Sequence, residues 1–86
     1  MRELEKLLKP LANRRRLALL KYLKTHRNAT VGQLADGIKL SFKATSKHLA
    51  VLRVADIVEA EQKGVVVDYS LASTLPSITK SIINII

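Results

Sequence analysis

The chain has 86 residues, a length that suits one domain with a single small core. It contains no cysteine, and its two histidines, His26 and His48, lack ligand-like spacing, so we expect no metal and no cofactor. The formal net charge is +8, and residues 1–53 hold 13 Lys and Arg against 3 Asp and Glu, so we expect a polyanionic partner such as nucleic acid or an anionic membrane surface.

Two helices are predicted at the start of the chain. Leucines recur with helical spacing before Pro10, which interrupts the first helix. Asn13 is placed to cap a second helix that ends near residues 26–28. The arginines after Asn13 favour a solvated helix face over phosphate contact, and Arg16 is a candidate for an internal pair with a carboxylate. The apolar face of the first helix is Leu4, Leu7, Leu8 and Leu11, and that of the second is Leu17, Leu20 and Leu23.

Two further helices are expected on either side of a tight turn. Thr30 and Gln33 have the spacing of a capping box at the start of a short helix over residues 31–37. Ser41 is the expected cap of the next helix, over residues 42–55. Two short helices in this arrangement are typical of a helix-turn-helix.

The helix over residues 42–55 has two different faces. Thr45, Leu49 and Leu52 form the expected inward stripe, with His48 at its border. At about 100° per residue, the opposite face is small, basic and hydroxyl-bearing. Phe42 is expected near the buried edge. The outward residues are Lys43, Ser46, Lys47, Ala50 and Val54.

A β-hairpin is predicted from residue 57 onward. The segments IVEAE and VVVDYSL are β-branched and alternating, and they are joined through residues 62–64, where Gly64 can adopt a positive φ. One face of the hairpin is expected to pack down while the other remains wet. A hairpin that directly follows a helix-turn-helix adds a wing.

The last segment predicts an apolar closing helix, capped by Ser73 or Thr74. Ile83 and Ile86 broaden its apolar face beyond what a small monomer easily covers. We therefore expect a homodimer joined by the first and last helices, about residues 2–9 and 74–86. The expected interface residues are Leu4, Leu7, Leu8, Leu75, Ile78, Ile82 and Ile85.

Together, these elements predict a mainly α protein with a small β-hairpin (α+β). The fold is a single winged helix-turn-helix domain over residues 1–86, in the order α-α-α-α-β-β-α. His48 is open to two interpretations, a structural bond to a nearby backbone group or a contact with DNA. The predicted DNA-binding residues are Thr30, Gln33, Ser41, Lys43, Ser46, Lys47, His48 and Lys63.

Nearly the whole chain resembles the ArsR/SmtB family of winged-helix transcriptional regulators. The similar runs are LANRRRLALLKYL, TVGQLADGI and SFKATSKHLAVLRVADIVEAEQKGVVVDYSL, and the most specific part is S-x-x-x-T-S-K-H-L-x-x-L-x-x-A-x-I-V from Ser41 to Val58. The resemblance implies a homodimer whose recognition helices enter successive major grooves, with an effector that releases the DNA.

The sequence departs from that family at three places. Residues 31–36 lack the paired cysteines of its metal and arsenic sensors, and residues 75–86 lack the aspartate and histidine of its zinc sites. The family wing is often rich in arginine, whereas this one carries Glu59 and Glu61 with only Lys63 near the tip. We therefore expect neither sensor site, and an effector of unknown identity if any.

The functional prediction is a dimeric, sequence-specific DNA-binding transcriptional regulator, a repressor, that reads the major groove of double-stranded DNA with helix 42–55. The alternative is a winged-helix protein-protein interaction module without operator specificity. A third, weaker alternative places the basic, leucine-rich first helix on anionic lipid.

An enzyme is not expected, and no catalytic residue is predicted. The chain has no nucleophile-base pair, no pair of acids at useful spacing and no phosphate loop. It also shows no secretory signal and no apolar run of about 20 residues, so we expect a cytoplasmic protein that has no membrane partner.

Overall fold

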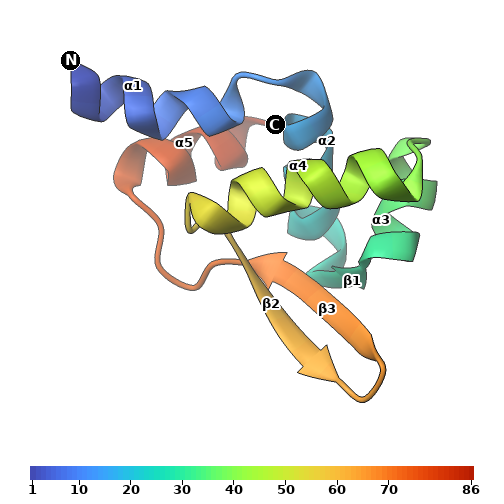
Figure 1. Cartoon of the computed structure of the whole chain (residues 1–86). Coiled ribbons are helices and arrows are strands. Elements are labelled where there is room, and N and C mark those ends of the chain that lie inside the picture. The colour runs from blue at the N-terminus through green and yellow to red at the C-terminus, as the bar shows by residue number, and fades with distance from the viewer.

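The computed structural model describes all 86 residues and confirms a mainly helical chain with a small antiparallel hairpin (Figure 1). The elements are α1 (Arg2–Leu8), the 3-10 helix η1 (Lys9–Leu11), α2 (Arg14–His26), β1 (Asn28–Thr30), α3 (Val31–Ile38), α4 (Phe42–Val54), β2 (Val58–Lys63), β3 (Val66–Leu71) and α5 (Ser77–Ile85).

Three helices begin at the side chains that the sequence predicts as caps. Asn13 Oδ1 accepts the N–H of Arg15 at 2.9 Å and that of Arg16 at 3.1 Å. Thr30 and Gln33 bond reciprocally, at 3.2 and 3.0 Å, and Ser41 Oγ accepts the N–H of Ala44 at 3.1 Å. Each cap satisfies amides that have no partner within the helix, and each contributes about 1 kcal/mol.

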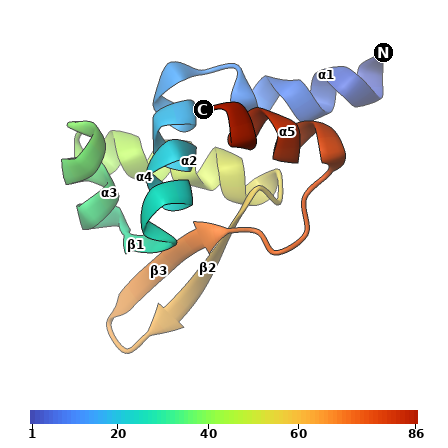
Figure 2. The same cartoon turned by 180° about the vertical axis from the view of Figure 1, so that it is seen from behind.

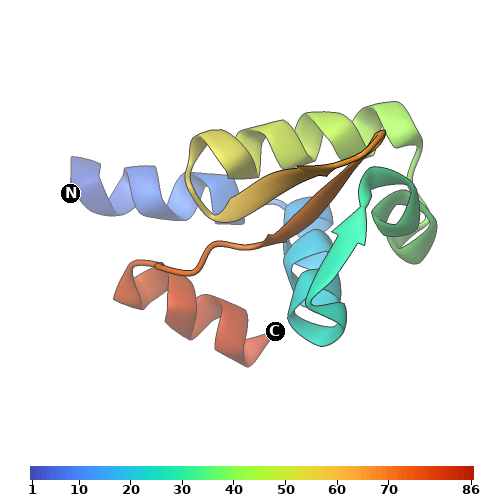
Figure 3. The same ribbon diagram turned by 90° about the horizontal axis from the view of Figure 1, so that it is seen from below.

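The core lies where α2, α3 and α4 meet. Its fully buried residues include Leu20, Leu34 and Leu49. The predicted inward stripe of α4 is confirmed, whereas α2 turns Leu19 fully inward and leaves Leu17 half-buried. Figure 3 shows the hairpin passing between α4 on one side and α5 on the other.

A three-residue strand, β1, is absent from the prediction. It pairs antiparallel with β3, and the sheet order is β1-β3-β2. Ala29 of β1 and Ala60 of β2 both face Tyr69 in the central strand. Because β1 contains no run of β-branched residues, its sequence alone gives no strand signal, and the strand forms through its pairing with β3. The positive φ predicted at Gly64 is confirmed, at 64°, but Gln62 and Lys63 lie in β2, so the turn is tighter than predicted.

The closing helix begins later than predicted. Its N-cap is Pro76 rather than Ser73 or Thr74, and Leu75 lies in the preceding linker. A residue before proline is disfavoured in helical conformation, so the helix cannot extend back through Leu75. Ser73 instead donates its N–H to Glu59 Oε1 at 3.2 Å.

α1 and α5 lie side by side at one end of the molecule (Figures 1 and 2). α1 buries no residue, and Pro10 lies in η1, where the helix tightens into 3-10 geometry. α5 directs Thr79 and Ile83 inward, while Ile82 packs partly against the core. No helix is both long and apolar enough to cross a membrane.

We predict that Gly37→Ala destabilises the domain. A Cβ built at Gly37 would lie 2.4 Å from Cε2 of Tyr22, whose ring stacks on His26 with centroids 4.0 Å apart. The ring must therefore move, at an expected loss of about 1–3 kcal/mol in unfolding free energy. Urea denaturation measures the loss.

Gly32→Ala is the matched control, because the nearest atom to a Cβ there is Thr30 Oγ1 at 3.9 Å. Alanine in that helix should stabilise the domain by about 0.5–1 kcal/mol. Equal effects of the two substitutions would contradict the close packing of Tyr22 on Gly37.

Candidate nucleic-acid interface

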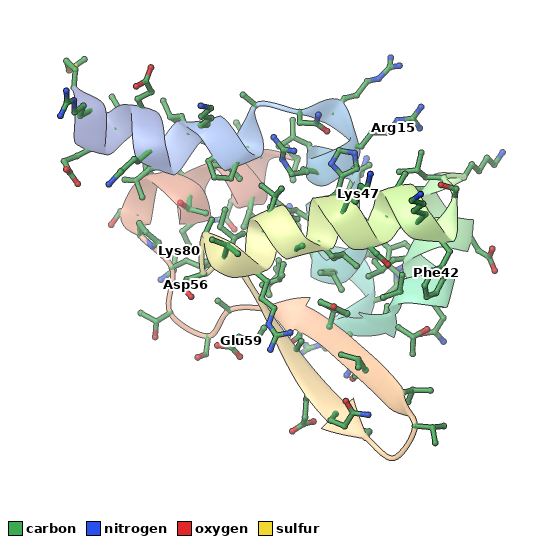
Figure 4. All side chains as sticks on the ribbon, viewed as in Figure 1. Arg15, Phe42, Lys47, Asp56, Glu59 and Lys80 are labelled. Atoms are coloured by element: carbon green, nitrogen blue, oxygen red, sulfur yellow. The ribbon has the colours of Figure 1, made fainter.

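One face of the molecule presents exposed cations and small side chains along α4. Lys43, Lys47 and Ala50 are exposed, and Ser46 beside them is half-buried. Arg15, from the first turn of α2, is drawn above α4 in Figure 4, and it lies close enough to α4 for its charge to act on His48. We call these five residues the basic face.

The cations of the basic face have no carboxylate partner. The two ion pairs of the structure both involve Lys63, on the hairpin. Uncompensated positive charge on the exposed face of a helix is an electrostatic feature suited to a polyanion. The sequence favours a solvated face for Arg15 over phosphate contact, whereas the structure leaves Arg15 half-buried near α4, a position that depends on how α2 packs against α4.

Arg16 connects three segments through its side chain. It pairs with no carboxylate, so the predicted internal pair of Arg16 with a carboxylate is wrong. Its Nε donates to Pro10 O at 2.6 Å, and Nη2 lies 3.5 Å from Lys9 O. Nη1 lies 3.4 Å from His48 Nδ1 on α4. The side chain joins η1 and α2 to the middle of the helix that carries the basic face.

His48 is half-buried and faces Arg16 rather than lying among the outward lysines. Burial, reinforced by the positive charges of Arg16 and Arg15, holds the pKa of His48 below its ordinary value of 6.5. The neutral ring can accept a hydrogen bond at Nδ1, which an imidazolium cannot. The structural interpretation of His48 is therefore favoured, although its partner is a side chain rather than a backbone group.

The remaining candidates at the helix starts already serve as caps. Thr30 and Gln33 bond each other's backbone, and Ser41 accepts an amide of its own helix. Gln33 and Ser41 are nevertheless exposed, so the Gln33 amide group and the Ser41 hydroxyl proton remain available as donors.

Phe42 is exposed over 62% of its surface, which contradicts its expected place near the buried edge. It is the first residue of α4, where no other element covers it. Its ring lies on the hairpin side of α4 (Figure 4). There it lines an open apolar groove of about 330 Å³ with Val31, Val65 and Val66.

The hairpin neutralises its own cation. Lys63 Nζ lies 3.4 Å from Glu61 Oε1 and 3.4 Å from Asp68 Oδ2. The hydrogen bond and charge of Asp68, followed by those of Glu61, raise the pKa of Lys63. Glu59 is a third acid near this group, so Lys63 lies among acids, unlike the cations of the basic face. No group of three or more histidine, cysteine or acidic residues is placed to hold a metal ion.

Comparison with known proteins identifies one family. Residues 13–60 match the family described as bacterial regulatory protein, arsR family. The transcriptional activator HlyU of Vibrio cholerae serotype O1 is 41% identical over 68 residues, which are 79% of this chain and 62% of that protein. The chain therefore spans less than two thirds of the length of this curated relative.

Solved structures share the fold. Reduced HlyU from Vibrio cholerae N16961 superposes with a TM-score of 0.79 at 36% identity, covering 93% of this chain and 80% of that one. The transcriptional repressor BigR from Xylella fastidiosa gives 0.81 at 28%, covering 98% and 82%. The homodimeric winged helix-turn-helix DNA-binding domain of Mb0332 from Mycobacterium bovis gives 0.77 at 24%, covering 95% and 69%, and supports the fold alone.

We predict that His48 makes the domain less stable at mildly acidic pH. Above pH 6.5 the ring is neutral in both states, and His48 contributes its full stability. As pH falls below 6.5 toward the lower folded pKa, only the unfolded chain takes up the proton, so stability is lost. Urea denaturation at about pH 7.5 and about pH 5.5 should show a larger drop for the unsubstituted protein than for His48→Gln.

His26→Gln is the control for the loss of an imidazole, since His26 is exposed on α2. The His26→Gln variant should lose as much unfolding free energy on acidification as the unsubstituted protein, because His48 is retained. If His48→Gln and the unsubstituted protein lose the same free energy on acidification, His48 does not couple folding to pH.

Proposed function

Because the chain belongs to the arsR family of bacterial regulatory proteins, we propose that it is a dimeric repressor that binds double-stranded DNA sequence-specifically. The observation that carries the proposal is the basic face of α4, whose cations have no internal partner. BigR, whose fold covers 98% of this chain, is a repressor, and HlyU is an activator. We choose the repressor because occupation of DNA by this domain is sufficient for repression.

In this proposal, α4 enters the major groove. A helix about 10–12 Å across fits the groove of B-DNA, which is about 12 Å wide. Ser46 and Ala50 let the helix backbone approach the base edges. Lys43 and Lys47, one turn apart, donate to guanine O6 and N7 or to phosphates.

The supporting contacts are to phosphate. Arg15 lies where the DNA backbone passes the start of α2, and Gln33 and Ser41 offer donors at the starts of α3 and α4. Thr30 holds Gln33 in place. Lys63 contributes when a phosphate replaces its carboxylate partners, and His48 maintains the attachment of α4 to Arg16.

The second copy binds along α1 and α5. α1 presents an open trough of about 650 Å³ lined by Met1, Leu4 and Leu8 among others. Ile78 and Ile85 of α5 are 39% and 82% exposed. A seven-residue helix with no fully buried residue is marginal alone and is stabilised when another surface covers it. Leu7, Leu75 and Ile82, which are half-buried in the monomer, border this interface.

Such a dimer reads an operator with two half-sites. Its two α4 helices would enter major grooves about one helical turn apart. The proposal places the protein in the bacterial cytoplasm with the chromosome, without a membrane partner or a catalytic residue.

The defining test is selection of bound duplexes from a random pool, followed by titration of the selected duplex and a scrambled one. We expect an inverted repeat and salt-dependent, selective binding. Lys47→Ala should weaken specific binding by about 1–3 kcal/mol, because a base contact is lost. Lys21→Ala, an exposed α2 cation outside the basic face, should change it little.

Two other outcomes would change the role of Lys47 or the function of the protein. An equal loss on the scrambled duplex would place Lys47 on phosphate. No enrichment, with equal weak binding to both duplexes, would reject the operator binder and favour the protein-protein interaction module.

We predict that Ile85→Asp converts the dimer to a monomer. The side chain is 82% exposed in a single chain, so the substitution should leave the monomer fold intact while burying an unpaired charge in the dimer. Sedimentation measures the mass, and circular dichroism confirms folding. Ile82 is less informative, because it packs against its own core.

Val65→Asp is the control, an equally drastic change at a hairpin residue that is 98% exposed. It should leave the dimer intact. A dimer that withstands Ile85→Asp would place the interface elsewhere.

A further inference from the structure

A recess of about 400 Å³ lies away from the basic face, between the end of α2, the linker that follows β3, and α5. The region between these elements is seen in Figure 3. Its apolar lining includes Leu23, Leu75 and Ile83, all of which belong to the core or pack against it. The volume is within the range of small-molecule pockets, about 300–1,000 Å³.

Three cations and no acid line this recess. They are Lys24, Arg27 and Lys80. Lys24 Nζ donates to Asn84 O at 3.0 Å, whereas Arg27 and Lys80 form no ion pair. Asp56 is drawn beside Lys80 in Figure 4, but it does not line the recess and is not ion-paired. An apolar lining with unpaired cations complements a molecule that is apolar over its body and anionic at one end.

Arg27 occupies a position that favours glycine. It ends α2 with φ 71° and ψ −51°, and its N–H is bonded to Leu23 O at 2.8 Å. A side chain larger than glycine in such a conformation costs of order 1–3 kcal/mol. The chain therefore carries a guanidinium at the recess despite the strain, which favours a role for its charge.

We infer that this recess binds a small amphipathic anion, an organic carboxylate or sulfonate with an apolar body. The apolar body contacts Leu75 and Ile83, and the anionic group pairs with Arg27 and Lys80. Binding of the anion at this recess does not require DNA. Its effect on DNA affinity, by contrast, rests on the proposed function. An anion held between Arg27 and Lys80 ties α2 to α5, the helix proposed to join the dimer.

The test uses the full chain without DNA and 8-anilinonaphthalene-1-sulfonate as a fluorescent amphipathic anion. We expect saturable binding that octanoate displaces and that octanol, its neutral analogue, displaces at least tenfold less effectively. Arg27→Gln/Lys80→Gln should weaken binding at least tenfold. Lys21→Gln/Lys39→Gln, which removes two exposed cations outside the recess, should leave it unchanged.

Arg27→Gly separates the charge from the fold. It removes the cation and relieves the positive-φ strain, so stability to urea should rise while affinity for the probe falls. Equal competition by octanol and octanoate, or equal binding by the two double variants, would overturn the anion site.

Titration of the selected DNA with and without octanoate then tests the consequence. If octanoate binds through Arg27 and Lys80 and shifts the DNA affinity, the recess is a regulatory site. If no DNA sequence is selected, the proposed function fails while the fluorescence titration still decides the anion site.

Discussion

The burial of one stripe of α4 determines where every proposed DNA-reading side chain lies. Thr45, Leu49 and Leu52 are completely inaccessible, and burying the two leucines stabilises this register by about 1.5–3 kcal/mol each. The hydroxyl of Thr45 has no hydrogen-bond partner, which costs about 1–3 kcal/mol. The register persists because the leucine burial outweighs that cost, and Lys43 and Lys47 are thereby fixed outward.

The parts of the fold that could be predicted are those set by neighbours along the chain. Asn13, Thr30 with Gln33, and Ser41 each cap their own helix within three residues, so the sequence contains both partners of each bond. The inward stripe of α4 follows from the helical spacing of its apolar residues alone. The same reasoning succeeds at Gly64, where a tight turn requires a positive φ.

The parts that could not be predicted depend on contacts between distant segments. β1 forms because it pairs with β3. Arg16 bonds to carbonyl groups of η1 and lies against the His48 ring on α4, and no spacing in the sequence indicates these partners. Phe42 is exposed because no other element covers the start of α4, which a helical wheel cannot show. The start of α5, by contrast, is predictable from the sequence, since the constraint of Pro76 on Leu75 is local.

α5 takes part in both the proposed dimer interface and the proposed anion site. It is joined to the rest of the chain by an extended linker, by the burial of Thr79 and Ile83, and by the bond from Lys24 to Asn84 O. α4, by contrast, is fixed by its buried stripe and by Arg16. A partner copy on Ile85 and an anion at Lys80 would therefore act on the less firmly attached helix. Because α4 is packed into the core, a shift of α5 would change the spacing of the two α4 helices in the proposed dimer without altering either one.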